Sequence, residues 1–186
     1  MFQVRIHGRG GQGVVSAAEM LSHAAFEEGK YSQAVPSFGS ERMGAPVVAY
    51  VRIDDQEIEL REPVLDPTLL IVQDPTLFTA IDVFAGLRED GYVLINTTRT
   101  LAQLGIEEAT RKLPAGHVAT VAATELALKH LKRPTPNTVL LGAFTAMSDT
   151  VHIDSVCVAI MKKFPGKVGE MNVEAARAAH EAAATT

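Results

Sequence analysis

The stretch VRIHGRGGQGVVSAAEML, residues 4–21, constrains the fold more than any other part of the chain. Residues 2–7 alternate in polarity and predict a strand, and apolar residues recur at helical spacing from Val14 onward. Between them, three glycines match the pattern G-x-G-x-x-G: Gly8, Gly10 and Gly13. A strand, a glycine-rich turn and a helix in this order predict the first unit of an open sheet covered by helices.

The rest of the chain continues the alternation of short apolar runs and helical patterns. Strands are predicted at 47–53, 69–74, 91–97 and 117–123, with a short hairpin strand at 57–60 after the turn DDQ. Helices are predicted at 75–87, 124–131, 137–147 (capped by Asn137), 153–164 and 172–183, a long loop at 31–46, and an irregular docking segment at 167–172. The pattern predicts one α/β domain over residues 1–186: a Rossmann-like, open, mostly parallel sheet with helices on both faces and a β-hairpin insertion.

Composition excludes several classes of function. The chain has 17 basic and 22 acidic residues, a net charge of −5, so nothing favours binding to nucleic acid or to an anionic membrane surface. The single cysteine, Cys157, excludes an internal disulfide and a cysteine-ligated cluster, and its apolar neighbours predict a buried thiol. The start MFQVRIHG lacks the pattern of a signal peptide, so we expect a cytoplasmic protein that does not span a membrane.

The glycine turn has the chemistry of an anion site. Its backbone N–H groups and the positive end of the following helix would face an anionic ligand. Because glycine has no Cβ atom, such a ligand could approach the backbone closely. The alternative is a tight crossover that binds nothing. A dinucleotide site is incomplete, because an acid should end the second strand and the first acid in that region is Glu41, beside Arg42. A Walker motif is also absent, since no Lys-Ser or Lys-Thr follows Gly13.

A second motif, PSFGSERMGAP, occupies residues 36–46. Arg42 suits a phosphate or a carboxylate, Ser37 and Ser40 can donate to the same ligand, and Glu41 can orient the arginine. The alternative is a loop closed by a Glu41–Arg42 pair at the surface.

Together, GRGGQG and PSFGSERMGAPV resemble the gamma subunit or gamma domain of the 2-oxoacid:ferredoxin oxidoreductases of the pyruvate, 2-oxoglutarate, 2-oxoisovalerate and phenylglyoxylate type. The resemblance spans Val4 to about Lys163, and the sequence departs from the family's ERRGGP at Met43 and Ala45. It implies a complex that decarboxylates a 2-oxoacid oxidatively to its acyl-CoA and passes electrons to ferredoxin or NAD. It also implies alpha, beta (thiamine-bearing) and delta (ferredoxin-like) partner subunits, with a flavin or NAD subunit in some complexes.

This chain lacks the Gly-Asp-Gly segment that holds thiamine diphosphate and its Mg²⁺, and it has one cysteine where a [4Fe–4S] cluster needs about four. The thiamine and the clusters are therefore expected on partner chains, with no catalytic residue and no metal ligand here.

The residues expected to face coenzyme A or the channel between subunits are Gly8, Arg9, Gly10, Gly11, Gln12, Gly13, Ser37, Phe38, Ser40, Glu41 and Arg42. Packing of the glycines against a partner backbone explains them equally well. Two further readings remain: a free-standing nucleotide-binding oxidoreductase and a non-catalytic scaffold.

Five residues outside these motifs have two interpretations each. His7 is an interior histidine or a proton carrier, and Asp74 is a helix N-cap or a ligand contact. Asn96, Thr97 and Thr98 line the crevice at the sheet edge or form a turn.

Overall fold

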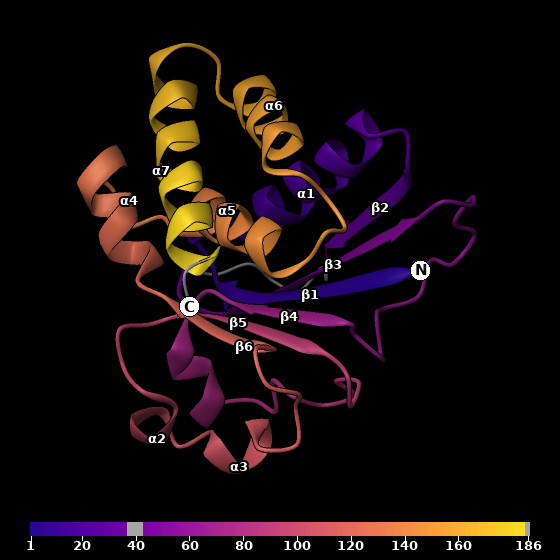
Figure 1. Cartoon of the computed structure of the whole chain (residues 1–186), viewed down its shortest axis with the longest axis vertical. Helices are drawn as coiled ribbons and strands as arrows, with labels where there is room; N and C mark the ends of the chain where they lie inside the picture. Colours follow the sequence, from indigo (N-terminus) through magenta and orange to yellow (C-terminus); the bar gives the residue numbers. More distant parts are fainter. Residues whose placement is uncertain (37–42, 185–186) are drawn as a thin grey trace.

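A six-stranded sheet forms the middle layer of the protein (Figure 1). The computed structural model describes residues 1–36 and 43–184. The strands are β1 (Phe2–Arg9), β2 (Tyr31–Pro36), β3 (Pro46–Asp54), β4 (Leu69–Val72), β5 (Tyr92–Asn96) and β6 (Val118–Val121). The helices are α1 (Val14–Glu27), the 3-10 helix η1 (Pro75–Thr79), α2 (Leu101–Leu104), α3 (Glu107–Thr110), α4 (Ala123–Leu131), α5 (Asn137–Met147), α6 (Ile153–Lys163) and α7 (Lys167–Ala184).

The strand order is β2-β3-β1-β4-β5-β6. Strand β3 is antiparallel to both of its neighbours, whereas β1, β4, β5 and β6 pair in parallel. Five of the six strands therefore point the same way, which confirms the predicted mostly parallel sheet.

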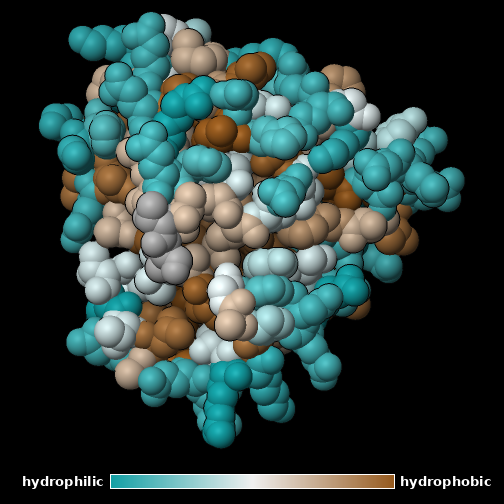
Figure 2. Space-filling model, in the orientation of Figure 1, coloured by the Kyte–Doolittle hydropathy of each residue, from teal (hydrophilic) through white to brown (hydrophobic). Residues whose placement is uncertain are grey.

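Helices cover both faces of the sheet, as predicted, but unequally. Successive side chains of β4 point to opposite faces of the sheet and belong to two different cores. Leu69 and Ile71 pack into the larger core, with α1, α4, α5, α6 and α7. Leu70 and Val72 pack into a smaller core on the other face. In Figure 1 the five longer helices lie above the strands, and the short α2 and α3 lie below. In Figure 2 a band of apolar residues crosses this view at the level of the strands, with polar residues above and below it.

The predicted hairpin is present, but in another place. Residues 57–60 form no strand, because the alternation EIEL finds no neighbouring strand to pair with. The hairpin is formed by β2 and β3, in which Tyr31 pairs with Asp54 and Pro36 pairs with Ala49. The prediction of a loop was therefore wrong for residues 31–36, which form the edge strand β2.

Three helix predictions also need correction. The predicted helix 75–87 is only the five-residue η1, followed by turns. The N-cap of α5 is Pro136, and Asn137 is the first helical residue. Residues 167–172 are regular and form the first turns of α7. Gly169 allows the helix to approach the carbonyl of Phe164 closely, since a Cβ there would lie 1.9 Å from that oxygen.

Candidate functional site

The chain reverses its direction of winding between β1 and β4. From β1 it crosses one face of the sheet through α1 to reach β2, and from β4 it leaves through η1 on the other face to reach β5. Open α/β sheets bind ligands at the carboxyl ends of strands at such a switch point. The glycine turn lies at this point, directly after β1.

The turn is shorter than the motif suggests. Gly8 and Arg9 still belong to β1 and pair with Val47 and Pro46. Gly11 has φ +93° and the helix N-cap Gly13 has φ +72°, values that residues with a side chain rarely adopt.

Most amides at the start of the motif already have acceptors within the protein. The N–H of Arg9 donates to Gln12 Oε1 (2.8 Å), and the N–H of Gly10 donates to the carbonyl of Ala45 (2.9 Å). The ladder of α1 begins with the N–H of Ala17, which donates to the carbonyl of Gly13. The N–H groups of residues 14–16 precede that ladder, and Gly13 provides no side chain to cap them. The capacity to bind an anion therefore lies at the start of α1 rather than in the glycines.

A cavity of about 310 Å³ opens at this helix start. It is lined by the turn, by Val14, Val15 and Ser16, and by Val47 of β3. No acidic residue lies in the first turn of α1, so the positive end of the helix dipole is not neutralised from within the helix. The cavity is thus suited to an anionic group.

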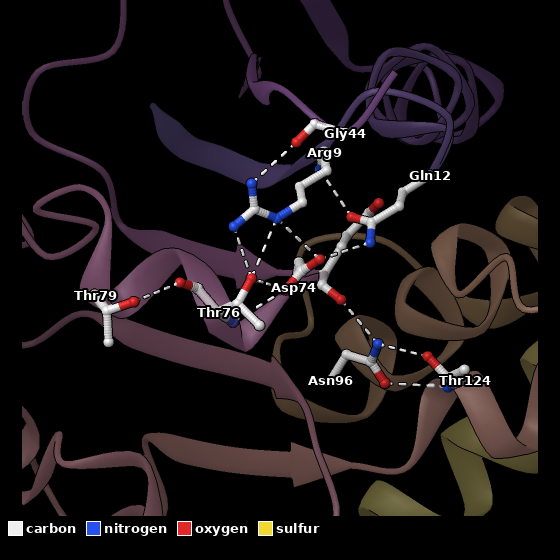
Figure 3. Close-up of polar contacts among 9 residues, drawn as sticks. Arg9, Gln12, Gly44, Asp74, Thr76, Thr79, Asn96 and Thr124 are labelled. Atoms are coloured by element: carbon white, nitrogen blue, oxygen red, sulfur yellow. Dashed lines mark hydrogen bonds and ion pairs between the residues drawn. The ribbon is translucent and has the colours of Figure 1, made fainter. Parts of the chain in front are cut away.

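Arg9 joins three segments of the chain (Figure 3). Its guanidinium donates to Thr76 Oγ1 (2.8 and 3.1 Å) and to the carbonyl of Gly44 (2.9 Å), and its Nε lies 3.3 Å from Asp74 Oδ2. Gln12 Nε2 donates to the same carboxylate oxygen at 2.9 Å. Arg9 and Gln12, both predicted to face a ligand, are thus engaged in holding the ends of β1 and β4 together.

Asp74 is the N-cap of η1, as the sequence predicted. Its Oδ1 accepts from the backbone N–H of Thr76 (3.0 Å) and from Thr76 Oγ1 (2.6 Å). Desolvation raises the pKa of Asp74, but the hydrogen bonds from Thr76 and Gln12 and the charge of Arg9 outweigh it, so the pKa is lowered. Asp74 is therefore a charged anchor for Arg9 at neutral pH.

The second motif meets the turn through its last residues. Ser37, Phe38, Ser40, Glu41 and Arg42 lie outside the described residues. The following segment returns to the turn: the N–H of Gly44 donates to the carbonyl of Gly10 (3.1 Å), and the Met43 side chain packs on Gly11, where an added Cβ would lie 2.9 Å from its Cε.

The next strand ends in a polar cross-link, which the sequence left open between a crevice and a turn. Asn96 Nδ2 donates to the carbonyl of Gln73 and to Thr124 Oγ1, both at 2.8 Å, and Asn96 Oδ1 accepts from the N–H of Thr124 (Figure 3). Asn96 therefore connects the carboxyl ends of β4 and β5 to the start of α4.

Two buried side chains beside the turn have unsatisfied polar atoms. His7 accepts from Arg5 Nε at its Nε2 (3.1 Å), so the proton of the neutral ring is on Nδ1, which has no partner among the described residues. Burial and the charge of Arg5 lower the pKa of His7 to about 4. His7 is thus an interior neutral histidine, the first of its two predicted readings.

Gln73 is 1 % exposed, and both polar atoms of its amide lack a partner within the described chain. Its Oε1 lies 3.2 Å from where a Cβ of Gly8 would be. Gln73 was not among the residues predicted from the sequence, where its only signal is that a polar residue directly follows four apolar ones.

Metal and membrane sites were not expected. Across residues 1–36 and 43–184, no three His, Cys, Asp or Glu side chains gather as a metal site, and no helix is long and apolar enough to cross a bilayer. Cys157 is 7 % exposed, and burial raises the pKa of its thiol, which confirms the predicted buried cysteine.

Comparison with known proteins gives consistent similarities. The family model described as pyruvate ferredoxin/flavodoxin oxidoreductase matches residues 3–182. Pyruvate synthase subunit PorC of Methanothermobacter marburgensis is 50 % identical over 181 residues, covering 97 % of both chains. The pyruvate/ketoisovalerate oxidoreductases common subunit gamma of Pyrococcus abyssi is 46 % identical, covering 97 % of this chain and 96 % of its own. The crystal structure of pyruvate oxidoreductase subunit PORC from Thermotoga maritima superposes with a TM-score of 0.80 at 37 % identity, covering 97 % of this chain and 95 % of that one.

Proposed function

The chain belongs to the pyruvate ferredoxin/flavodoxin oxidoreductase family, as a gamma subunit of a 2-oxoacid oxidoreductase complex, and from this premise we propose what it contributes. It forms the coenzyme A side of a site shared between subunits. The partner chains carry thiamine diphosphate, Mg²⁺ and the [4Fe–4S] clusters, and they perform the oxidative decarboxylation. The single buried cysteine of this chain does not fit a cluster.

The observation that carries this proposal is the start of α1. Three residues whose amides lack an intrahelical acceptor line a cavity of about 310 Å³, next to a turn in which Gly11 has no side chain. The N–H groups of Val14, Val15 and Ser16 would hold a phosphate or a pantetheine carbonyl of coenzyme A. Arg9 would act indirectly, by fixing the turn to η1 and to Gly44.

A nucleotide-binding oxidoreductase that works alone is the weaker candidate. The strand that should end in a ribose-binding acid is β2, whose sequence YSQAVP contains no acidic residue. A ligand bound here would therefore lack the ribose contact of a dinucleotide enzyme.

The test is Ser16→Asp in the assembled complex, with Ser16→Asn as the neutral control of matched size. Ser16 is the third residue of α1 and is half-buried at the cavity. An aspartate there suits the helix dipole and preserves thermal stability, but it repels an anionic ligand. We expect KM for coenzyme A to rise about tenfold, which corresponds to about 1.4 kcal/mol, with KM for the 2-oxoacid unchanged.

An unchanged KM for coenzyme A in a fully assembled Ser16→Asp complex contradicts the proposal. If the variant folds but is excluded from the complex, the turn packs against a partner backbone instead. Gel filtration of the purified complex distinguishes these two results.

A further inference from the structure

A second cavity, of about 280 Å³, lies where α4 and α6 end and α5 and α7 begin. Its walls are apolar and are formed by Leu131, Phe164, Val168 and Met171. Val168 is 58 % exposed although it is one of these walls. The cavity therefore presents apolar surface to the outside of the chain.

The floor of the cavity consists of two buried asparagines. Asn137 and Asn172 are 4 % and 7 % exposed, and the oxygen of each side chain already accepts from Thr138, at 2.9 and 2.8 Å. Asn172 Nδ2 donates to the carbonyl of Val168 and Asn137 Nδ2 to that of Gly13. Each amide nitrogen has two hydrogens and uses one of them in these bonds. Each asparagine can therefore still donate one hydrogen bond. An occupant with an acceptor fits it.

The rim of the cavity is cationic. Arg133 is exposed and makes no hydrogen bond or ion pair within the described parts of the chain, and Lys167 directly precedes Val168. Helices α5 and α7 run in parallel, because Thr138 contacts Asn172 near their starts and Thr145 contacts His180 further along. The positive N-terminal ends of both helix dipoles therefore lie at this cavity. Glu170 is the one acid in the first turns of these two helices. This end of a chain with net charge −5 thus favours an anion.

We propose that this cavity and Arg133 form a docking socket for a partner subunit, which inserts an apolar side chain next to a carboxylate. The inference rests on the proposed function only in that the chain must assemble into a complex. Apolar surface beside an arginine that lacks an internal partner is typical of residues that dominate binding at protein interfaces. Charge complementarity selects an acidic, apolar segment.

The groove between α6 and α7 is the competing surface. It also exposes apolar side chains, Val158 at 42 % and Met161 at 36 %. Its two cations, however, are already paired: Arg177 lies 2.7 Å from Asp154, and Lys162 lies 2.6 Å from Glu27. Within the described residues, that groove therefore keeps no unpaired cation with which to select an acidic partner.

The test is competitive assembly. Wild-type and variant chains with different tags are co-expressed with the partner chains, and mass spectrometry measures their ratio in the complex relative to the total pool. Arg133→Glu and Val168→Trp should each lower incorporation at least tenfold. The loss for Arg133→Glu should shrink in high salt. Arg133→Lys and Val168→Leu should assemble almost normally, which separates loss of docking from loss of folding.

Two variants serve as matched controls: Arg111→Glu directly after α3, on the opposite face of the sheet, and Val158→Trp in the α6–α7 groove. Both should be incorporated at parity with wild type. Incorporation of Val168→Trp or Arg133→Glu at parity overturns the inference, as does a loss seen only for Val158→Trp. If the wild-type chain itself fails to bring down partner chains, the proposed function fails rather than the socket.

Discussion

The side chain of Arg9 lies 3.3 Å from Asp74, and this pair connects the ends of the two strands at which the sheet reverses its direction of winding. Gln12 and Thr76 donate to the same carboxylate. The residues that an anion site would use for binding are thus used to hold the turn in place.

Replacing Asp74 by alanine should lower the free energy of unfolding by about 1–2 kcal/mol, because η1 loses its N-cap and Arg9 loses its anchor. Urea denaturation of the purified chain measures this. Asp90→Ala is the control, since Asp90 is exposed and contacts only Arg88 among ion-pairing groups of the described chain; it should change stability by less than about 0.5 kcal/mol. Equal effects of the two variants would contradict the role of Asp74.

The same variant has a predicted pH dependence. The pKa of Asp74 is lowered in the folded state, so its stabilisation is present above the unfolded pKa of about 3.9 and is lost as pH falls through the folded value. The stability difference between wild type and Asp74→Ala should therefore shrink in acid below about pH 4.

His7 should make the protein less stable as pH falls from about 6.5 to 4. Its folded pKa is about 4 against an ordinary 6.5, so in this window the unfolded state binds a proton that the folded state excludes. The loss is on the order of 3 kcal/mol at most. His7→Gln should flatten this slope relative to wild type, and His152→Gln, which removes an exposed histidine, is the control. Parallel pH profiles for wild type and His7→Gln would rule out the assignment.

Gly142→Ala should destabilise the protein by roughly 1–3 kcal/mol, although alanine is the better helix former. A Cβ at this position would lie 1.9 Å from the carbonyl oxygen of Ala176, so α5 and α7 must separate. Ala176→Gly should not rescue the variant, because the contact is with backbone. Thermal unfolding of the single and double variants decides this, and a rescue would show that side-chain crowding is responsible.

Gly13→Ala should be destabilising for two separable reasons. The residue has φ +72°, and its Cβ would meet the side-chain amide of Asn137. In an Asn137→Ala background only the backbone strain remains, about 1–2 kcal/mol. A double-mutant cycle should therefore be non-additive, and strict additivity would show that Asn137 adapts freely.

The central strands could be predicted because continuous apolar runs such as LLIV leave few alternatives. Strand β2 could not. YSQAVP has no apolar run, its residues are half-buried or exposed, and its strand conformation depends on pairing with β3. Residues 57–60 show the converse: they have the alternation of a strand but no neighbour.

The glycine turn was predictable in position, but its contacts were not. The glycines place the turn, and their absent Cβ atoms point to a close approach. The acceptors of Arg9 and Gly10 depend on Gly44 and Ala45, more than thirty residues away, whose position follows only from the β1–β3 register. Gln73 was missed for the same reason, since its burial is a property of the assembled edge.

The two backbone hydrogen bonds that join Gly10 to Gly44 and Ala45 have a thermodynamic consequence. They make the turn and the return segment of the hairpin one cooperative unit. A ligand or partner that reduces the motion of one segment reduces the motion of the other, so part of the entropy lost on the second binding event is already lost in the first. Two binders that contact different segments can therefore favour each other's binding without touching and without a visible change of shape.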